Sequence, residues 1–266
     1  MSNAKKIQIV IAAIVLLVSY WIKKGENNSD FSSEKTVENI GDFNYLPTST
    51  TGVIVKHDGY QLSYSEQHEQ AEWVAYSLNK SDIVYNNFKR PYFINDPKVK
   101  TKSANWRSYK KSGYDKGHLC PAADRRYSKA AHDETFYTSN ISPQKHDFNA
   151  GIWNRLEQKT RYWAKKNQHL YVITGGILKP GLKTIGKNKV SVPTEFYKIL
   201  LDYSQPEIKA IAFLFPHEES KKPIYEFVVS IDALEEKTGI DFFPELPNAI
   251  ETKLEASSNY KNWSFR

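Results

Sequence analysis

One long helical pattern, set among many short strand patterns, constrains the fold of this chain more than any other feature. From Asn149 to Lys166 the larger side chains recur at steps of three and four residues, as on one face of an α-helix. The neighbouring segments read as strands, and Ile208–Pro216 is apolar at nearly every position, which indicates a central strand. With 266 residues and 14% aromatic residues, the chain is large enough for a substantial core. The pattern therefore predicts an α+β fold.

The remaining elements follow from alternation and turn signals. His57-Asp58-Gly59 predicts a hairpin turn, because Asp-Gly favours the tight turns that join antiparallel strands. Ile231–Thr238 reads as a helix that ends at Gly239. The predicted strands are Thr51–Val55, Tyr60–Tyr64, Gln70–Leu78, Phe136–Ile141, Leu170–Thr174, Thr194–Tyr203, Ile208–Pro216 and Tyr225–Ser230.

The N-terminal residues separate into an apolar run and a polar tract. Two lysines precede the almost wholly apolar run Ile7–Ile22, a pattern typical of a signal sequence. The run is short for a membrane-spanning helix, which needs about 17–25 residues. However, Tyr20 and Trp21 resemble an interfacial aromatic belt, and no cleavage site follows the run. We therefore expect residues 1–24 to be a signal-anchor rather than a cleaved signal peptide, 25–43 a flexible linker and 44–266 the folded domain.

This organisation carries an expectation about location and partners. The basic end should stay in the cytoplasm, so the domain should be anchored in the inner membrane and face the periplasm. If the segment is cleaved, the protein should be periplasmic or secreted. The net charge of +7 and a pI near 9.1 favour a polyanionic partner, nucleic acid first and an anionic membrane surface second. The single cysteine, Cys120, excludes an internal disulfide.

The chemistry concentrates in Asp115-Lys116-Gly117-His118. The unperturbed pKa of a histidine lies near neutrality, so His118 can accept a proton at working pH. Lys116 brings a cation to the same place, as a phosphate-handling site requires. Gly117 allows another group to approach the backbone closely. Four such residues also occur in ordinary surface turns, so the tetrapeptide alone leaves both interpretations open.

The segments that follow decide between them. Phe136-Tyr137-Thr138-Ser139-Asn140 is followed by Pro143-Gln144 and then by Asn149, Trp153, Leu156 and Glu157. Together with the tetrapeptide, this series resembles the DNA/RNA non-specific endonuclease family, which includes mitochondrial endonuclease G and secreted bacterial nucleases. Family-like stretches extend from about Tyr45 to Pro247. The resemblance implies a mixed central sheet flanked by helices, with a ββα-metal finger at the site.

The resemblance also implies two central roles and one cofactor. His118 corresponds to the general base that activates water, and Asn149 to the residue that binds the metal at the start of the helix. The implied metal is Mg²⁺, with Mn²⁺ as a substitute, and Mg²⁺ keeps most of its waters and often takes one or two protein ligands. A helix N-cap is the alternative role for Asn149, because asparagine strongly favours that position.

Supporting roles fall on six further residues. Glu157 lies two helical turns beyond Asn149 and is expected near the waters of the metal, while Arg161 pairs with Glu157 or contacts phosphate. Lys116 stands where the family usually has arginine, so the charge is kept but the bidentate geometry is lost. Catalysis is therefore assigned to His118, Glu157 and Lys116, metal binding to Asn149, substrate binding to Lys116, Arg161 and Arg90, and structural support to Asp115 and Asn140.

The leading interpretation is a metal-dependent endonuclease that hydrolyses phosphodiester bonds in both DNA and RNA. A membrane-tethered nucleic-acid-binding module with little turnover is the main alternative, and Lys116 in place of arginine keeps it open. A phosphodiesterase for small nucleotides is a third. The sequence leaves the oligomeric state open, a homodimer included. It also leaves open which of the two substrates, DNA or RNA, is preferred.

Overall fold

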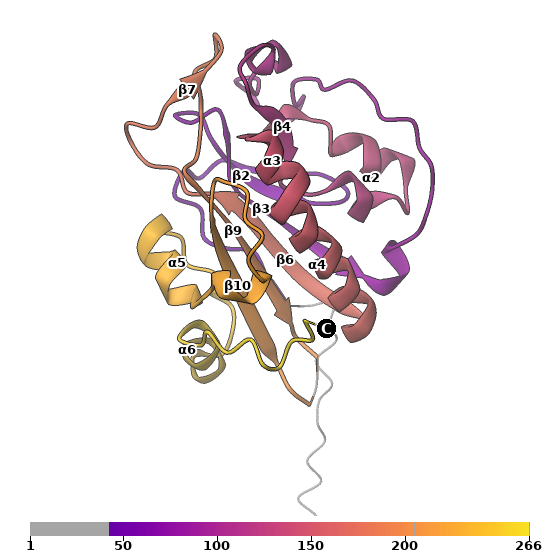
Figure 1. The fold of residues 1–266 in the computed structure, drawn as a ribbon, viewed down its shortest axis with the longest axis vertical. Helices are drawn as coiled ribbons and strands as arrows, with labels where there is room; N and C mark the ends of the chain where they lie inside the picture. Colours follow the sequence, from indigo (N-terminus) through magenta and orange to yellow (C-terminus); the bar gives the residue numbers. More distant parts are fainter. Residues whose placement is uncertain (1–42, 205, 266) are drawn as a thin grey trace, which may run out of the picture. The chain divides into compact units, whose positions relative to one another are not determined.

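A seven-stranded antiparallel sheet forms the centre of the molecule (Figure 1). The computed structural model describes residues 43–204 and 206–265; the predicted segment 1–24 and almost all of the predicted linker lie outside them. The strand order is β1-β2-β3-β6-β9-β10-β11, and neighbouring strands within it run antiparallel. The strands are β1 (Ile54–Lys56), β2 (Gln61–Ser65), β3 (Gln70–Asn79), β6 (His169–Gly176), β9 (Glu195–Asp202), β10 (Lys209–Pro216) and β11 (Val228–Val229).

The two faces of this sheet pack against different helices. In β9, Phe196 and Leu200 join the core that contains Trp153 and Leu156, whereas the alternate residue Ile199 joins the core on the other face. This alternation follows from the two-residue period of a strand. The long helix α4 (Asn154–Asn167) covers the first face, and α5 (Ile231–Thr238) and α6 (Asn248–Glu255) cover the second (Figure 1).

A second, two-stranded sheet carries the conspicuous tetrapeptide. The strand β4 (Asp115–His118) pairs antiparallel with β5 (Ile141–Gln144), so that His118 lies opposite Ile141. The helix α3 (His146–Phe148) follows, and a π-helical segment η5 (Asn149–Trp153) joins it to α4. Strand, strand and helix in this order form the ββα unit expected from the resemblance, beside the large sheet (Figure 1).

The connections hold short elements. The two-stranded sheet of β7 (Thr184–Ile185) and β8 (Val190–Ser191) projects from the connection between β6 and β9, and α2 (Lys129–Glu134) follows β4. Ser128 caps α2 through its hydroxyl, and Ser230 does the same for α5. The 3₁₀ turns are η1 (Lys80–Asp82), η2 (Trp106–Tyr109), η3 (Ala122–Arg125), η4 (Thr138–Asn140) and η6 (Ile224–Phe227).

The predicted α+β class is confirmed, but the central sheet is antiparallel among the described strands rather than mixed as expected. Two element predictions are wrong in detail. The strand predicted at Phe136–Ile141 begins only at Ile141, because Thr138–Asn140 forms a 3₁₀ turn. The strand predicted at Tyr225–Ser230 shrinks to Val228–Val229, after the 3₁₀ turn Ile224–Phe227. Helix α5 has the predicted bounds, and Gly239 caps it with a φ of 71°, in the left-handed region that favours glycine.

Candidate active site

The β4–β5 hairpin presents His118 and Lys116 on one face. Residues two apart in a strand point the same way, so these side chains lie together and Asp115 and Gly117 lie on the other face. A Cβ atom at Gly117 would come within 2.1 Å of the Gln144 side chain, which packs directly over that glycine. Glycine is therefore required for the close packing between the two strands of the finger.

His118 lies among aromatic rings and keeps one ring nitrogen unpaired. Its ring centroid is 5.0 Å from that of Phe136 and 5.6 Å from that of Phe93. Nε2 is buried and has no hydrogen-bond partner among the described residues. Burial, together with the positive charges of Arg90 and His132, lowers the pKa of His118 to about 3. The imidazole is therefore neutral at pH 7, the form that accepts a proton.

The same two aromatic rings hold two cations beside the histidine. The Arg90 guanidinium carbon lies 5.3 Å from the centre of the Phe136 ring, and the Lys116 ammonium lies 5.2 Å from that of Phe93. Both distances are within the range of cation–π attraction. Arg90 is exposed and Lys116 is half-buried, so both charges remain accessible to a phosphate group. The structure thus brings together three residues that the sequence analysis assigned to the site.

The side chain of Asn149 is held in position by an acidic residue of strand β4. Its side-chain nitrogen Nδ2 donates a hydrogen bond to Oδ2 of Asp115, at 3.0 Å. The same Oδ2 is 2.9 Å from Nδ1 of His146, a residue to which the sequence analysis gave no role. The bond from Nδ2 fixes the orientation of the amide and leaves Oδ1 as its acceptor group. Asp115 therefore orients the side chain that the sequence analysis assigned to metal binding.

The alternative role of Asn149 as a helix N-cap is wrong. Its backbone is helical, with φ −61° and ψ −48°, and its N–H donates to the carbonyl of Lys145 at 2.9 Å. The N-cap position belongs to Lys145, because α3 begins at His146. Since the Asn149 amide is not used for capping, its oxygen remains for another ligand. An amide oxygen with few protein partners suits Mg²⁺, which prefers hard oxygen ligands and retains its waters.

The π-helical segment η5 changes the relation of Glu157 to Asn149. In an unbroken α-helix these residues would be about 80° apart around the axis, because each residue turns by about 100°. The wider π turn accommodates one extra residue and reduces this angle, and Gly151 kinks the chain there with a ψ of −110°. Ile152 N–H donates to Glu219 at this kink, at 2.8 Å. The sequence analysis placed the two residues on one face without this turn.

Glu157 faces a network of charges rather than one partner. Its pKa is raised to about 7, because burial and the charge of Asp124 outweigh the lowering by Lys198 and Arg161. Lys198 is fully buried, donates to Thr174 Oγ1 at 2.6 Å, and lies 5.1 Å from the centre of the Trp153 ring. Burial lowers the pKa of Lys198. The expected pairing of Arg161 is therefore corrected: its guanidinium binds Asp124 at 2.8 Å, so Arg161 belongs to this network.

Asn140 holds the chain just beyond His118. Its side-chain oxygen accepts from the Cys120 N–H at 2.8 Å, and its side-chain nitrogen donates to the Cys120 carbonyl at 2.9 Å and to that of Thr135 at 2.9 Å. The amide is fully buried, so these bonds are shielded from water. Cys120 is also fully buried, and burial raises the pKa of its thiol to about 12. The thiol is therefore a packing group rather than a nucleophile.

His217 also positions the site, although the sequence gave it no role. Its Nδ1 is 2.8 Å from the carbonyl of Pro193, and Nε2 accepts from the Lys145 N–H at 2.7 Å. These partners define the neutral tautomer with the proton on Nδ1. Burial lowers the pKa of His217 to about 4. The residue thereby fixes the turn between β5 and α3, and no motif near β4 indicates it.

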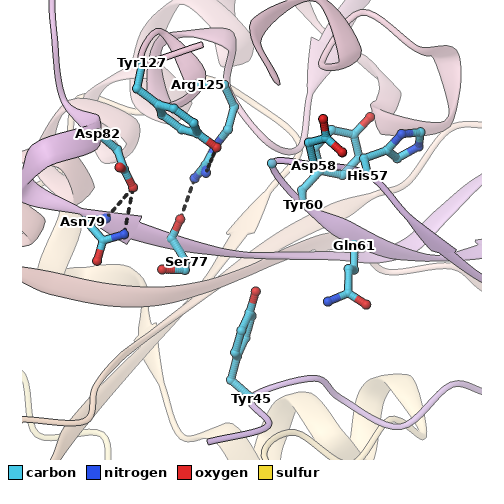
Figure 2. A pocket seen from close by; sticks show the side chains of 11 residues that line it. Tyr45, His57, Asp58, Tyr60, Gln61, Ser77, Asn79, Asp82, Arg125 and Tyr127 are labelled. Atoms are coloured by element: carbon cyan, nitrogen blue, oxygen red, sulfur yellow. Dashed lines mark hydrogen bonds between the residues drawn. The ribbon is translucent and has the colours of Figure 1, made fainter. Parts of the chain in front are cut away.

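Two cavities are candidates for the place where a substrate binds. One of about 390 Å³ adjoins the finger and is lined by residues that include Tyr114, Lys145, Lys183 and His217. Another, of about 260 Å³, is drawn in Figure 2. In it Arg125 donates to the carbonyl of Ser77 at 2.7 Å, and no residue assigned to the site lines it. The finger and the first cavity, rather than the second, form the candidate active site.

The comparison with known families decides what this finger is. The sequence profile described as DNA/RNA non-specific endonuclease matches residues 43–249, well over half of the chain. The chain belongs to the DNA/RNA non-specific endonuclease family. This confirms the resemblance given by the tetrapeptide and the series from Phe136 to Glu157, and with it a nuclease family that acts on nucleic acids and depends on metal.

Relatives and solved structures agree with this assignment. The zebrafish protein "Nuclease EXOG, mitochondrial" is 38% identical over 252 residues, covering 88% of this chain and 72% of the zebrafish one. Human "Endonuclease G, mitochondrial" is 32% identical, covering 71% of this chain and 69% of its own. In a solved EndoG/EndoGI complex, a chain 30% identical matches with a TM-score of 0.68, over 73% of this chain and 87% of that one.

The same comparison corrects the predicted location. The similar nucleases from zebrafish, human and yeast are mitochondrial proteins, which contradicts the inner-membrane-anchored, periplasmic or secreted location expected from the N-terminal run. A basic start and an apolar run describe many targeting segments, so they do not identify the membrane concerned. Within residues 43–204 and 206–265, the structure has no helix of the length and apolarity that crossing a membrane requires.

Proposed function

We propose that this family member is an Mg²⁺-dependent endonuclease that hydrolyses phosphodiester bonds in DNA and RNA without regard to the sugar. The observation that carries the proposal is the ββα finger itself, in which Asp115 holds the Asn149 amide by a 3.0 Å hydrogen bond while His118 keeps a buried, unpaired Nε2. These are the two groups that a base-assisted hydrolysis with one weakly ligated metal requires.

His118 is the general base in this proposal. Its low pKa keeps the imidazole neutral, and the rings of Phe93 and Phe136 fix its plane. The unprotonated ring nitrogen then takes a proton from the attacking water as the new P–O bond forms and the bond to the leaving oxygen breaks. A neutral base within hydrogen-bond reach of water contributes about 10²–10⁴-fold to the rate.

The charged residues of the finger bind the phosphate. Lys116 and Arg90 flank His118 through the two aromatic rings, so their charges face the phosphodiester that lies over the histidine. Asn149 Oδ1 would hold the metal. When bound, Mg²⁺ supplies charge neutralisation and an acidic water for the leaving oxygen. Glu157 would accept hydrogen bonds from waters on the helix side of the finger, backed by Lys198 and Arg161.

The basic surface supports binding of long polyanions. The net charge is +7, and Tyr114, Lys145 and Lys183 line the cavity beside the finger, where the Lys183 ammonium lies 5.3 Å from the centre of the Tyr114 ring. An aromatic ring next to cations suits stacking of an unpaired base beside its phosphate. We infer substrate contacts along this cavity in addition to those at His118.

Two further parts of the proposal concern location and partners. The mitochondrial relatives support a mitochondrial location for this chain. Residues 1–24, with their basic start and apolar run, are the segment proposed to attach it to a membrane. The structural neighbour was solved in complex with EndoGI, under a title that describes EndoG inhibition. An inhibitor partner for this chain is therefore part of the proposal, and a homodimer is a separate expectation. Organelle fractionation tests the location, and mass photometry tests the oligomeric state.

A plasmid-nicking assay tests the proposed activity. The purified chain should nick supercoiled DNA and cleave RNA with Mg²⁺ or Mn²⁺ present, and a chelator should stop both reactions. Cleavage of a p-nitrophenyl phosphodiester without cleavage of plasmid would instead indicate a small-nucleotide phosphodiesterase. Tight DNA binding without turnover would indicate the binding module.

A further inference from the structure

A cluster of five carboxylates lies on the face of the sheet opposite the finger. Asp232, Glu235 and Glu255 place oxygen atoms within 4.8 Å of one another, and so do Asp241, Glu251 and Glu255. Figure 1 shows α5 and α6 side by side, away from β4 and α3. Glu255 belongs to both triads and is therefore the centre of the cluster. Acidic groups often gather on a surface without a ligand, so the argument depends on Glu255.

Glu255 is buried in the cluster, and one of its oxygens is unpaired among the described residues. Its exposed fraction is 7%, and its Oε1 has no hydrogen bond among the described residues. A buried oxygen left unpaired is costly, and a buried carboxylate that faces other carboxylates is more so. The four charged groups that act on it most strongly are all acids: Glu235, Glu251, Asp241 and Asp232. A cation or a proton must therefore compensate Glu255 in the folded protein.

Helix geometry holds the cluster together in spite of this repulsion. Asp232 and Glu235 are three residues apart on α5, and Glu251 and Glu255 are four apart on α6, so each pair shares a helix face. Backbone contacts fix two members from outside: the Phe242 N–H donates to Glu235 Oε1 at 2.8 Å, and the Asp241 N–H donates to Thr48 at 2.8 Å. The first contact holds the Glu235 carboxylate itself, and the second holds the backbone of Asp241 beside it.

We propose that this cluster binds one Ca²⁺ ion, at a site separate from the catalytic metal and centred on Glu255. The donors are all carboxylate oxygens, with no histidine or cysteine in either triad, which disfavours zinc. Ca²⁺ binds oxygens at about 2.3–2.6 Å, so two ligands on opposite sides of the ion are about 4.6–5.2 Å apart. Mg²⁺ draws such ligands to about 4.2 Å and demands a stricter octahedron.

Bound Ca²⁺ would join α5, the connecting segment and α6. Asp232 and Glu235 come from α5, Asp241 from the connection, and Glu251 and Glu255 from α6. Neutralising these charges removes the repulsion that separates the two helices. The ion therefore acts on stability and on the packing of α6 against the sheet, and leaves the chemistry at His118 unchanged.

The alternative occupant is a proton on Glu255. Burial, together with the negative charges of Glu235, Glu251, Asp241 and Asp232, raises the pKa of Glu255 to about 8. The folded protein then holds a proton that the unfolded chain releases above about pH 4.5. Without calcium, stability therefore falls as pH rises from about 4.5 to about 8 and levels off above that. Calcium must displace this proton, so its affinity should rise between pH 6 and pH 9.

Titration of the chelator-treated protein with CaCl₂ and MgCl₂ tests the site. We expect one Ca²⁺ bound per chain outside the finger, and a rise in Tm of at least about 3 °C at saturating calcium, with a smaller rise for magnesium. Glu255→Gln should abolish this rise, and Glu245→Gln, an exposed glutamate outside both triads, should retain it. Asn149→Ala should also retain it, which separates this site from the catalytic one.

A second variant guards against misfolding of Glu255→Gln. Asp232 and Asp241 are exposed, so the double substitution Asp232→Asn and Asp241→Asn should fold normally and weaken calcium binding at least tenfold. Nicking with Mg²⁺ should stay at the wild-type rate in both variants. An equal calcium-induced rise in Tm in the wild type and the double variant would overturn the proposal, as would no rise in the wild type. A loss of stability between about pH 4.5 and pH 8 that calcium does not relieve would identify the proton as the occupant.

Discussion

The Asp115 carboxylate accepts a hydrogen bond from the Asn149 side-chain amide at 3.0 Å, and this contact joins the first strand of the finger to its helix. An asparagine amide otherwise has two orientations that differ by exchange of oxygen and nitrogen. The acid selects the orientation in which the nitrogen is used and the oxygen is left for a ligand.

Removing that acid should weaken metal binding without removing the metal ligand. Asp115→Ala frees the Asn149 amide, and loss of a group that orients a ligand typically costs about 10–100-fold in metal affinity. We expect the Mg²⁺ concentration for half-maximal nicking to rise by about tenfold or more, with some activity restored at high Mg²⁺. Asp147→Asn, on an exposed residue of α3, is the matched control. An unchanged Mg²⁺ requirement in Asp115→Ala would show that Asn149 does not depend on this contact.

The burial of His118 sets the pH dependence of the reaction. Because its pKa is lowered to about 3, the free enzyme keeps a neutral base well below pH 6.5. The profile of kcat/KM should therefore lack an acid limb from His118 near 6.5. The stability that neutral His118 contributes is complete above pH 6.5 and is lost as pH falls from 6.5 toward 3.

The effect of Glu157 on that pH profile must be distinguished from the effect of His118. Its pKa of about 7 predicts an acid limb of its own, so the profile should be measured for wild type and for Glu157→Gln, with folding checked by circular dichroism. The limb near pH 7 should disappear in the variant. A limb that persists there in Glu157→Gln contradicts the assignment of a neutral, buried His118.

Lys116 should contribute charge rather than geometry. Lys116→Ala removes one phosphate contact, so the slope of log K against log salt concentration should become shallower by about 0.9 for duplex DNA. Lys116→Arg should keep the wild-type slope, because the charge is retained. Lys165→Ala, an exposed lysine late in α4, serves as the control for net charge. Equal slopes in Lys116→Ala and Lys165→Ala would remove Lys116 from the phosphate contacts.

His217 should affect activity by positioning the turn after β5, and it should also stabilise the folded protein. His217→Ala removes the acceptor for the Lys145 N–H, and an unpaired buried polar group costs about 1–3 kcal/mol. We expect urea denaturation to show a loss of that size in the free energy of unfolding, and the nicking rate of the folded variant to fall while DNA binding persists. A stable variant with the wild-type rate would mean that the turn after β5 does not need His217.

The sequence predicted those elements whose signals are local. Ile231–Thr238 appears with its predicted bounds because Gly239 ends it by a conformation that only the local chain determines. The tetrapeptide and the series from Phe136 to Glu157 identified the finger, because a hairpin and the helix after it use nearby residues. Most of the proposed site follows from these segments.

The sequence analysis did not predict the features that depend on contacts between residues far apart in the chain. The strand predicted at Phe136–Ile141 is interrupted because the Asn140 side chain bonds to Cys120 and Thr135. The hydrophobic periodicity of the sequence does not reveal such contacts. The pairing of Arg161 with Asp124 joins α4 to the turn after β4, and His217 reaches the finger from the end of β10. The π turn at Asn149–Trp153 lies within a pattern that reads as a continuous α-helix.

Nicking rate against Mg²⁺ concentration, for wild type, His118→Ala and Asn149→Ala, tests the central claim most directly. His118→Ala should lose roughly 10²–10⁴-fold in rate at every Mg²⁺ concentration, with DNA binding unchanged, because it removes only proton transfer. Asn149→Ala should need more Mg²⁺ for whatever activity remains, and a chelator should abolish activity in all three proteins. A near wild-type rate in His118→Ala, or cleavage that survives chelation, would contradict this mechanism.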